Sequence, residues 1–303
     1  MSRPGTTGQS TGEPVCRLFG LSASPHRVRA SFWLLDAPDS LLQQSRRDPD
    51  GTGLGTYAAD GTPVVEKQPL AAYGDREFAE EAKHRYSATF IAHIRFATTG
   101  DLLPQNTHPF TQRGRLFAHN GVVEDLPRLE SELGPDLGLV HGDTDSERVF
   151  ALITRHIDIC RGDVTAGITA GVRWLADNQP IYALNFVLTT PDSLWALRYP
   201  DTHDLLVLER RAGGPSGGRH LQHASATGRI RARAEHLAEY PSVVVASEQM
   251  DEDPGWTPLR SGELLHVDRE LGTSREVIVD RPPRHQICLD DLGARAAAAQ
   301  AQQ

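Results

Sequence analysis

Short apolar runs typical of β-strands occur along most of this chain in neighbouring pairs, and this pairing is the feature that most constrains its fold. Helical patterns fall in two groups between the runs and do not follow each strand in turn. The runs lie at residues 16–24, 62–65, 89–96, 114–123, 182–190, 193–198, 205–209 and 242–247. Regular alternation of strand and helix would indicate a parallel sheet, so the grouping predicts a layered α+β fold with largely antiparallel sheets. The pattern alone leaves the number of layers open.

The chain is long and apolar enough to bury a sizeable core, since 39% of its 303 residues are hydrophobic. No apolar run approaches the ~20 residues of a membrane helix, and the beginning of the chain lacks the apolar segment of a signal peptide. The net charge of −9 and the lack of a Lys/Arg stripe argue against a nucleic-acid partner. We therefore expect a cytoplasmic protein that acts on a small molecule and contacts neither nucleic acid nor membrane.

Composition divides the chain into three parts. Residues 1–15 are rich in Gly, Ser, Thr and Pro and predict a disordered leader. Residues 16–275 are expected to form the domain, and residues 276–303, which end in RAAAAQAQQ, are expected to form a tail. Within the domain, residues 48–57 are rich in turn formers, and residues 210–241 predict a long insertion or mobile loop.

The three cysteines are too few and too scattered for a disulfide framework, and neither a CxxC nor an HExxH pattern indicates a zinc site. Cys160 lies in a helical pattern and Cys288 lies near the tail, so both are interpreted as structural. Most cysteines are simply small apolar residues. Cys16 differs because it follows the leader directly and begins the run CRLFG. It is therefore the candidate nucleophile, and we expect no metal and no cofactor.

Arg95 ends an apolar run in the segment HIRFATTG. An arginine at the end of a strand is usually a solvated charge. Here the small hydroxyl residues Thr98 and Thr99 follow it. The combination suits bidentate binding of a carboxylate, assisted by hydroxyl or backbone donors.

Asn120 and Gly121, in the segment FAHNGVV, have two interpretations. Asn-Gly is the strongest short signal for a hairpin turn, and an isolated pair would be read that way. An Asn amide and a Gly N–H are also suitable donors for an oxyanion hole. The sequence leaves both interpretations open.

Asp143 and Asp145, in the segment GDTDSE, precede the apolar face of a clear helix. Capping and interaction with the helix dipole explain one of the two acids, with Thr144 and Ser146 as further cap residues. The other acid is then free to bind a substrate ammonium group. Arg95, Asn120 and Asp145 follow one another at intervals of 25 residues, each near the end of a predicted element, so one cleft can contain all three.

Seven segments resemble, in order, those of the class II glutamine amidotransferases. They are CRLFGLSAS, DPDGTGLGTY, HIRFATTG, NTHPF, FAHNGVVEDL, GDTDSERVFALI and VVVASEQMDEDPGW. The most similar branch is the short, stand-alone bacterial one that includes the γ-glutamyl hydrolase of ergothioneine synthesis. The resemblance extends from residue 16 to about residue 268. Each motif alone is weakly specific, and their order and spacing are what identify the family.

The resemblance implies a four-layer αββα sandwich of the N-terminal nucleophile hydrolase type. It implies hydrolysis of the side-chain amide of glutamine or of a γ-glutamyl compound, with Cys16 as nucleophile and Asn120 and Gly121 as the oxyanion hole. It also implies that Arg95 binds the substrate α-carboxylate and Asp145 the α-ammonium group. Further contacts to the amino-acid end are implied for Thr98 and Gly121. The ammonia released from glutamine can be passed to a partner enzyme in this class.

The expected chemistry requires Cys16 to be the first residue. A thiol with a pKa near ~8.5 is partly protonated at neutral pH, and a free α-amine of pKa ~7.7 to 8.0 on the same residue is a suitable base. Residues 1–15 are therefore expected to be absent from the active protein. A cut between Val15 and Cys16 would remove them, and so would translation from a GTG codon at Val15.

Two other functions fit parts of the same sequence. A metal-dependent hydrolase would use the Asp, His and Asn side chains of the HNG and GDTDSE segments, namely His119, Asn120, Asp143 and Asp145. A non-enzymatic subunit would keep the glutamine pocket without a reactive cysteine. The physiological substrate and the fate of ammonia stay open at this point.

Overall fold

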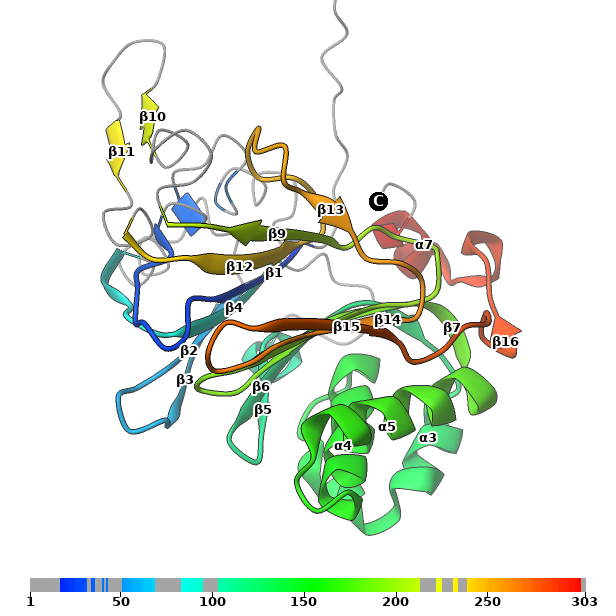
Figure 1. Ribbon diagram of the computed structural model, residues 1–303. Helices are drawn as coiled ribbons and strands as arrows, with labels where there is room; N and C mark the ends of the chain where they lie inside the picture. The colour runs from blue at the N-terminus through cyan, green and yellow to red at the C-terminus, as the bar shows by residue number, and fades with distance from the viewer. Residues whose placement is uncertain are drawn as a thin grey trace, which may run out of the picture.

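Two β-sheets pack face to face, and helices cover the outer face of one of them (Figure 1). The computed structural model describes residues 17–31, 34–35, 40, 42, 51–68, 83–94, 103–212, 222–224, 231–233 and 239–300. None of the helices in these ranges combines the length and the apolar character that crossing a bilayer requires.

The first sheet has seven strands in the described part of the chain, in the order β13-β9-β12-β1-β4-β2-β3, and its neighbouring strands are antiparallel. They are β1 (Arg17–Ser22), β2 (Thr52–Tyr57), β3 (Pro63–Gln68), β4 (Thr89–Ile94), β9 (Leu206–Arg210), β12 (Ser242–Ala246) and β13 (Thr257–Pro258). β1 lies between β4 and β12, with Arg17 opposite Ile94 and Phe19 opposite Ala246. The beginning of β1 is therefore held deep inside the sheet.

The second sheet has the order β15-β14-β8-β7-β6-β5, and β16 adds a short parallel pairing to β7. Its strands are β5 (Phe110–Gln112), β6 (Arg115–Val123), β7 (Pro180–Thr189), β8 (Leu194–Arg198), β14 (Glu263–Val267), β15 (Thr273–Val277) and β16 (His285–Gln286). A separate hairpin joins β10 (Gln222–Ala224) and β11 (Arg231–Arg233). The long central pair β6–β7 forms the backbone of the second sheet.

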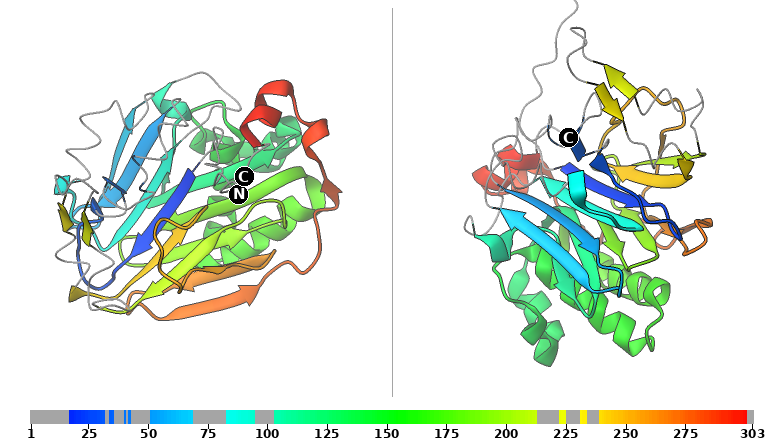
Figure 2. Two further views of the ribbon diagram at one scale, coloured as in Figure 1. Left: turned by 90° about the horizontal axis from the view of Figure 1, so that it is seen from above. Right: turned by 90° about the vertical axis from the view of Figure 1, so that its left-hand side faces the viewer.

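Three helices pack on the second sheet, on the side away from the first sheet, as the right panel of Figure 2 shows. They are α3 (Leu126–Leu133), α4 (Asp145–Ile159) and α5 (Val164–Asn178). Thr144 is the N-cap of α4 and accepts a hydrogen bond from the Glu147 N–H at 3.3 Å, as its sequence predicts. Short 3₁₀ turns are η3 (Pro104–Asn106), η4 (Gly134–Leu139) and η6 (Leu289–Asp291).

The core is divided by the two sheets. Alternate residues of each strand point to opposite faces, so Leu18 of β1 and Leu116 and Ala118 of β6 meet between the sheets. Phe117 of β6 points the other way and packs with the helices. The hydroxyl of Tyr57, on β2, crosses the gap and donates a hydrogen bond to the Thr189 carbonyl of β7 at 2.6 Å.

The predicted α+β fold with antiparallel sheets is confirmed, together with one helical layer. The segments that would cover the outer face of the first sheet lie largely outside the described residues. The same holds for most of the predicted loop at 210–241.

Residues 52–57, which were expected to belong to a turn-rich segment, form the strand β2 instead. Their glycines are needed for a close approach, because a Cβ added to Gly53 would lie 1.8 Å from the His108 carbonyl oxygen. A glycine that makes room for a neighbouring backbone looks, in the sequence, like a glycine that makes a turn.

The segment expected to be a tail from residue 276 contributes to the packed structure. Ile278 and Val279 are buried against the helical side of the second sheet. The alanine-rich end forms the helix α7 (Ala294–Gln300), with Ala296 and Gln300 buried. In Figure 1 this helix, coloured red, lies beside the first sheet and above one end of β7.

Candidate active site

Asn120 and Gly121 lie inside β6, not in a turn. Asn120 is directly opposite Asn185 of β7 and Gly121 is opposite Leu184, within a continuous antiparallel ladder. The hairpin interpretation of this pair is therefore wrong. Close packing explains why position 121 is a glycine, since a Cβ there would lie 1.9 Å from the Ala183 carbonyl oxygen.

The Asn120 side chain lies on the face of β6 that looks toward the first sheet. Leu116 and Ala118, four and two residues earlier, belong to the core between the sheets, and strand alternation gives Asn120 the same face. Asn185 shares this face with Val187 for the same reason. Both asparagines are almost fully buried. The two buried amide side chains thus lie on directly opposite residues of neighbouring strands, in the largely apolar interface between the sheets.

The covering of the inner face of the second sheet changes at the Asn120–Asn185 pair. On one side of it, the inner face of the second sheet is covered by the first sheet. On the other side, Val122 and Ala183 pack against Leu292 and Ala296 of the C-terminal segment. The cover thus changes from a sheet to a helix at the level of the Asn120–Asn185 pair.

Asp145 contacts β6 at a bulge. The β6–β7 register shifts between Val122 and Val123, so that Val123 is opposite Ile181 and not Tyr182. The Val123 N–H donates to Oδ2 of Asp145 at 2.9 Å, and the Ser146 hydroxyl donates to Oδ1 at 3.3 Å. These two bonds fix the Asp145 carboxylate at the first turn of α4. It contacts β6 at Val123, two residues after Gly121.

His119 points to the helical side of the same strand. Its Nδ1 is 3.0 Å from the Ser146 hydroxyl and its Nε2 is 3.3 Å from the Ala183 carbonyl oxygen. Burial lowers its pKa, although the nearby Asp145 carboxylate acts in the opposite direction. His119 and Asn120 therefore face opposite sides of the sheet and do not converge on one ion, which argues against the metal-dependent alternative. Among the described residues, no group of three or more metal-ligating side chains gathers.

Asp143 anchors the GDTDSE loop rather than a substrate. Its N–H donates to Oδ1 of Asn106 at 2.8 Å, and the Asn106 amide donates back to Oδ2 of Asp143 at 3.3 Å. The Gly142 N–H donates to Oε2 of Glu147 at 2.6 Å. The NTHPF and GDTDSE motifs are therefore joined, and this contact holds the start of α4 and Asp145 in place.

The beginning of β1 is held by the last of the seven motifs. The Arg17 guanidinium donates to Oε1 of Glu248 at 2.6 Å. The Leu18 N–H donates to the Ser247 hydroxyl at 3.1 Å, and the Ser247 N–H returns a bond of 3.1 Å to the Leu18 carbonyl. The residue that directly precedes Arg17 is Cys16, which lies outside the described residues.

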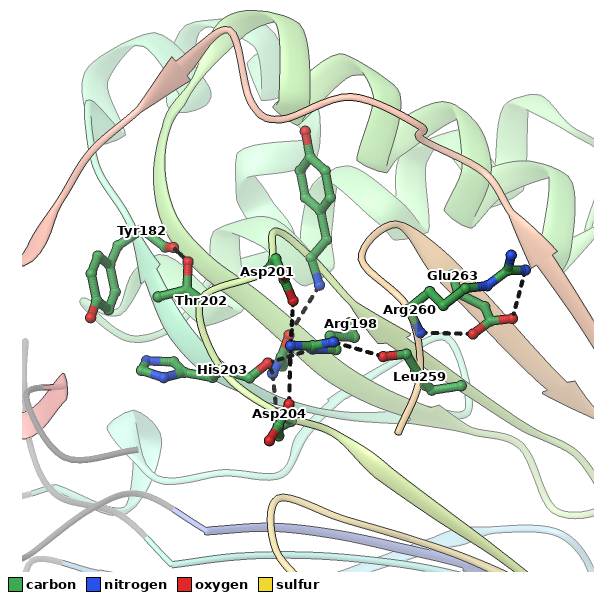
Figure 3. Close-up of polar contacts among 11 residues, drawn as sticks. Tyr182, Arg198, Asp201, Thr202, His203, Asp204, Leu259, Arg260 and Glu263 are labelled. Carbon is green, nitrogen blue, oxygen red and sulfur yellow. Dashed lines mark hydrogen bonds and ion pairs between the residues drawn. The ribbon is translucent and has the colours of Figure 1, made fainter. Parts of the chain in front are cut away.

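Asn185 fixes the loop that contains Asp201, His203 and Asp204, which Figure 3 labels. Its Oδ1 accepts the Tyr199 N–H at 3.0 Å, and its amide donates to the carbonyls of His203 at 3.2 Å and Asp204 at 3.3 Å. The Arg198 guanidinium also holds this loop. It donates a hydrogen bond of 2.7 Å to the His203 carbonyl and forms ion pairs with Asp201 and Asp204. No sequence motif predicts this loop, because the backbone groups that Asn185 bonds lie 14 to 19 residues further along the chain.

Half of the predicted site residues can thus be placed. Asn120, Gly121 and Asp145 come together around the end of β6. Cys16, Arg95 and Thr98 lie outside the described residues. Their described neighbours Arg17 and Ile94 are cross-strand partners in the first sheet.

Comparison with known proteins gives the family. The profile of the class-II glutamine amidotransferases matches residues 15–288. The chain is 29% identical over 263 residues to a γ-glutamyl-hercynylcysteine sulfoxide hydrolase of Mycolicibacterium smegmatis, covering 84% of this chain and 96% of the relative. It is 32% identical over 133 residues to a probable glutamine amidotransferase of Saccharomyces cerevisiae, covering 40% of this chain and 37% of the relative.

The fold agrees with the sequence match. A glutamine aminotransferase class-II domain protein from Silicibacter pomeroyi superposes with a TM-score of 0.55 at 19% identity, covering 86% of this chain and 98% of that structure. The family profile and the layered fold extend over most of the same residues. The chain therefore belongs to the class II glutamine amidotransferases, enzymes that hydrolyse a γ-glutamyl amide.

Proposed function

We propose that the protein hydrolyses γ-glutamyl amides through a thioester on Cys16, with the Asn120 side chain and the Gly121 N–H stabilising the oxyanion. Asp145 binds the substrate α-ammonium group in this proposal. Arg95 binds the α-carboxylate, with a further contact from Thr98.

The placement of Asn120 carries the proposal. Its amide is buried on the face between the sheets, at the level where the first sheet gives way to the C-terminal helix. An amide donor held in a water-poor site needs no reorganisation as negative charge develops. Asp145 supports the assignment of the amino-acid end, because a carboxylate has about four lone-pair positions and two neighbours occupy two of them.

The reaction has two halves. The α-amine of Cys16 removes the thiol proton, the thiolate attacks the amide carbon, and the oxyanion forms beside Asn120 and Gly121. The C–N bond then breaks, and the leaving nitrogen takes the proton from the α-ammonium group. Water attacks the thioester, returns the proton to the thiol and releases glutamate.

We propose a γ-glutamyl amine or peptide as the physiological substrate, because the relative from Mycolicibacterium smegmatis bears a γ-glutamyl hydrolase name and aligns over 96% of its length. A second proposal is that glutamine is cleaved and ammonia passes to a separate acceptor enzyme. Copurification of a stoichiometric synthetase from the native host would favour the second. A cytoplasmic location is part of both proposals and agrees with the free thiols of Cys160 and Cys288.

The test is an assay of glutamate release from glutamine and from γ-glutamyl amides. It uses protein that begins at Cys16 and, in parallel, protein that begins at Met1. We expect activity in the first, loss of activity on thiol alkylation, and no loss with EDTA. Activity that is lost to EDTA but survives alkylation would favour a metal-dependent hydrolase.

Two variants separate binding from chemistry. Arg95→Ala and Asp145→Ala should mainly raise KM, because their side chains are assigned to the part of the substrate that does not react. Glutamine binding without any turnover by protein that begins at Cys16 would instead identify a non-enzymatic binding subunit.

A further inference from the structure

The C-terminal helix α7 covers the sheet immediately beyond the Asn120–Asn185 pair. Leu292 and Ala296 pack on Val122 and Ala183, which form the next rung of the β6–β7 ladder on the same face. The family's profile match ends at residue 288, before this helix begins. The wall beside the asparagine pair is thus built from a part of the chain that the shared family pattern does not include.

The polar contact between this wall and the site is made by His203. Its Nε2 is 2.8 Å from Oε1 of Gln300, the last residue of α7, and both side chains are almost fully buried. The His203 carbonyl accepts the hydrogen bond from the Asn185 amide described above. One residue therefore connects α7 to the strand position directly opposite Asn120.

The second nitrogen of His203 has no hydrogen-bond partner among the residues that the structure describes. A carbonyl oxygen of Gln300 can only accept, so Nε2 carries the ring proton. Burial lowers the His203 pKa to about 4, so the ring is neutral at pH 7 and Nδ1 is an acceptor. Nδ1 is buried and meets no donor among the described residues. Buried acceptors are nearly always satisfied in folded proteins, so Nδ1 is an acceptor that a donor on a bound molecule can satisfy.

The ring of His203 contacts Tyr182 and is influenced by the charge of Arg17. Figure 3 shows the ring pointing away from Arg198, on the side of Tyr182, with which it makes an edge contact at 5.4 Å between centroids. The positive charge of Arg17 is close enough to help lower the His203 pKa. Arg17 is the first described residue after Cys16, so the ring interacts electrostatically with the residue that follows the candidate nucleophile.

We propose that α7 and His203 form the leaving-group side of the substrate pocket, where Nδ1 of His203 accepts a hydrogen bond from an N–H or O–H group on the departing amine. This inference rests on the proposed function. It names the substrate class as γ-glutamyl amides of amines that carry a further hydrogen-bond donor, in preference to glutamine. The proposed function assigns Arg95, Thr98 and Asp145 to the α-amino-acid end of the substrate. The His203 imidazole is therefore assigned to the leaving amine at the opposite end.

The test compares pairs of substrates of equal size. In one pair the amide nitrogen of γ-glutamate carries a 2-hydroxyethyl or a propyl group, and in the other a 3-hydroxypropyl or a butyl group. The wild-type protein is expected to prefer the hydroxyl member of at least one pair by about tenfold in kcat/KM, the usual worth of one buried hydrogen bond. This comparison needs no variant.

Two variants of His203 separate its two nitrogens. In His203→Asn the side-chain oxygen can occupy the Nδ1 position, so the preference should remain even though the Gln300 contact is lost. In His203→Gln the amide can still donate to Gln300, but the Nδ1 acceptor is gone, so the preference should disappear. Thermal midpoints of both proteins identify any variant that fails to fold. A purely structural role would give the opposite order, with Gln better than Asn.

Three outcomes would overturn the inference. They are equal cleavage of both members of each pair by the wild-type protein, a preference that survives in His203→Gln, and a preference lost in a folded His203→Asn. In each of these cases the γ-glutamyl amides are still hydrolysed, so the proposed function stands. Failure to cleave any γ-glutamyl amide or glutamine, by protein beginning at Cys16, would refute the proposed function itself.

Discussion

The β6–β7 strand pair is apolar at one level and polar at the next, although both levels belong to the same ladder. Around Leu116, Ala118 and Val187 the inner face is sealed by the first sheet. At Asn120 and Asn185 the same face carries two buried amides. The strand geometry is equal in both places, so the difference lies in what covers the face and in what the covered groups bond to.

The comparison shows how one sheet can serve stability and chemistry separately. The apolar level gains its free energy from burial, which depends on fit and not on direction. The polar level is stable because Asn185 bonds a loop that Arg198 secures. Replacing residues of the first level should therefore change unfolding, and replacing Asn120 should change turnover.

The largest effect is expected at Gly121, where β6 lies directly against the backbone of β7. In Gly121→Ala the new Cβ would lie 1.9 Å from the Ala183 carbonyl oxygen, a backbone atom that cannot rotate away. We expect a loss of more than about 4 kcal/mol in the free energy of unfolding, or failure to fold. Gly114→Ala is the control, since no atom lies within 4 Å of its Cβ position, and only its positive φ should cost about 1–2 kcal/mol. Equal unfolding curves for both variants would contradict the ladder position of Gly121.

Asn120→Ala should change the chemistry at the polar level. Loss of one oxyanion donor lowers kcat by about 10² to 10³, or roughly 2.7–4 kcal/mol in the barrier, with little change in KM. Steady-state kinetics with glutamine or a γ-glutamyl amide measure this effect. An Asn120→Ala protein with unchanged kcat would remove the oxyanion role and leave Asn120 as a structural amide.

Leu116→Ala is the matched change at the apolar level of the same strand. Leu116 is fully buried between the sheets, and its truncation should lower the free energy of unfolding by about 3 kcal/mol through lost burial and a cavity. Urea unfolding measures the loss, and kcat per folded molecule should stay near the wild-type value. A large fall in kcat would show that the two levels are not independent.

The smallest effect concerns pH. Burial holds the pKa of His203 near 4, below the value of about 6.5 in an unfolded chain. Its contribution to stability is therefore complete above pH 6.5 and is lost as the pH falls toward 4, at about 1.4 kcal/mol per pH unit. Arg17, Arg198 and Asp204 are the charged groups that act on the ring.

Urea unfolding at pH 7 and pH 5 tests this expectation. Between these values the wild-type protein should lose about 2 kcal/mol more than His203→Gln. The pKa of His119 is also lowered, mainly by burial, but His119 is present in both proteins and cancels in the difference. An equal pH dependence in the two proteins would show that the His203 ring is open to solvent.

The fold was predictable where its causes are local. The apolar run at residues 114–123 identifies β6, and Thr144 identifies the start of α4, because short buried strands and helix caps are decided within a few residues. The strand β2 was missed, since the need for Gly53 comes from the backbone of His108, far along the chain. The helix α7 was missed because its burial depends on Val122 and Ala183, not on its own alanine-rich pattern.

The site divides in the same way. Asn120, Gly121 and Asp145 were found because they belong to family motifs, and the strand predicted at residues 114–123 already included the Asn-Gly pair. His203 was not found, because no motif contains it and its partner Gln300 is 97 residues away. Contacts that depend on long-range packing, such as Asp145 with the Val123 N–H, became visible only in the folded chain.

The central claim is that Cys16 is both the first residue of the active protein and its nucleophile. Intact-mass analysis of the protein from its native host, after incubation with a diazo ketone derived from glutamine, tests both parts together. We predict one adduct on a chain that begins at Cys16, located on Cys16 by fragmentation, and no adduct on Cys160 or Cys288 or on a Cys16→Ser protein. An active, labelled protein that still begins at Met1, or one labelled at another residue, would contradict the account.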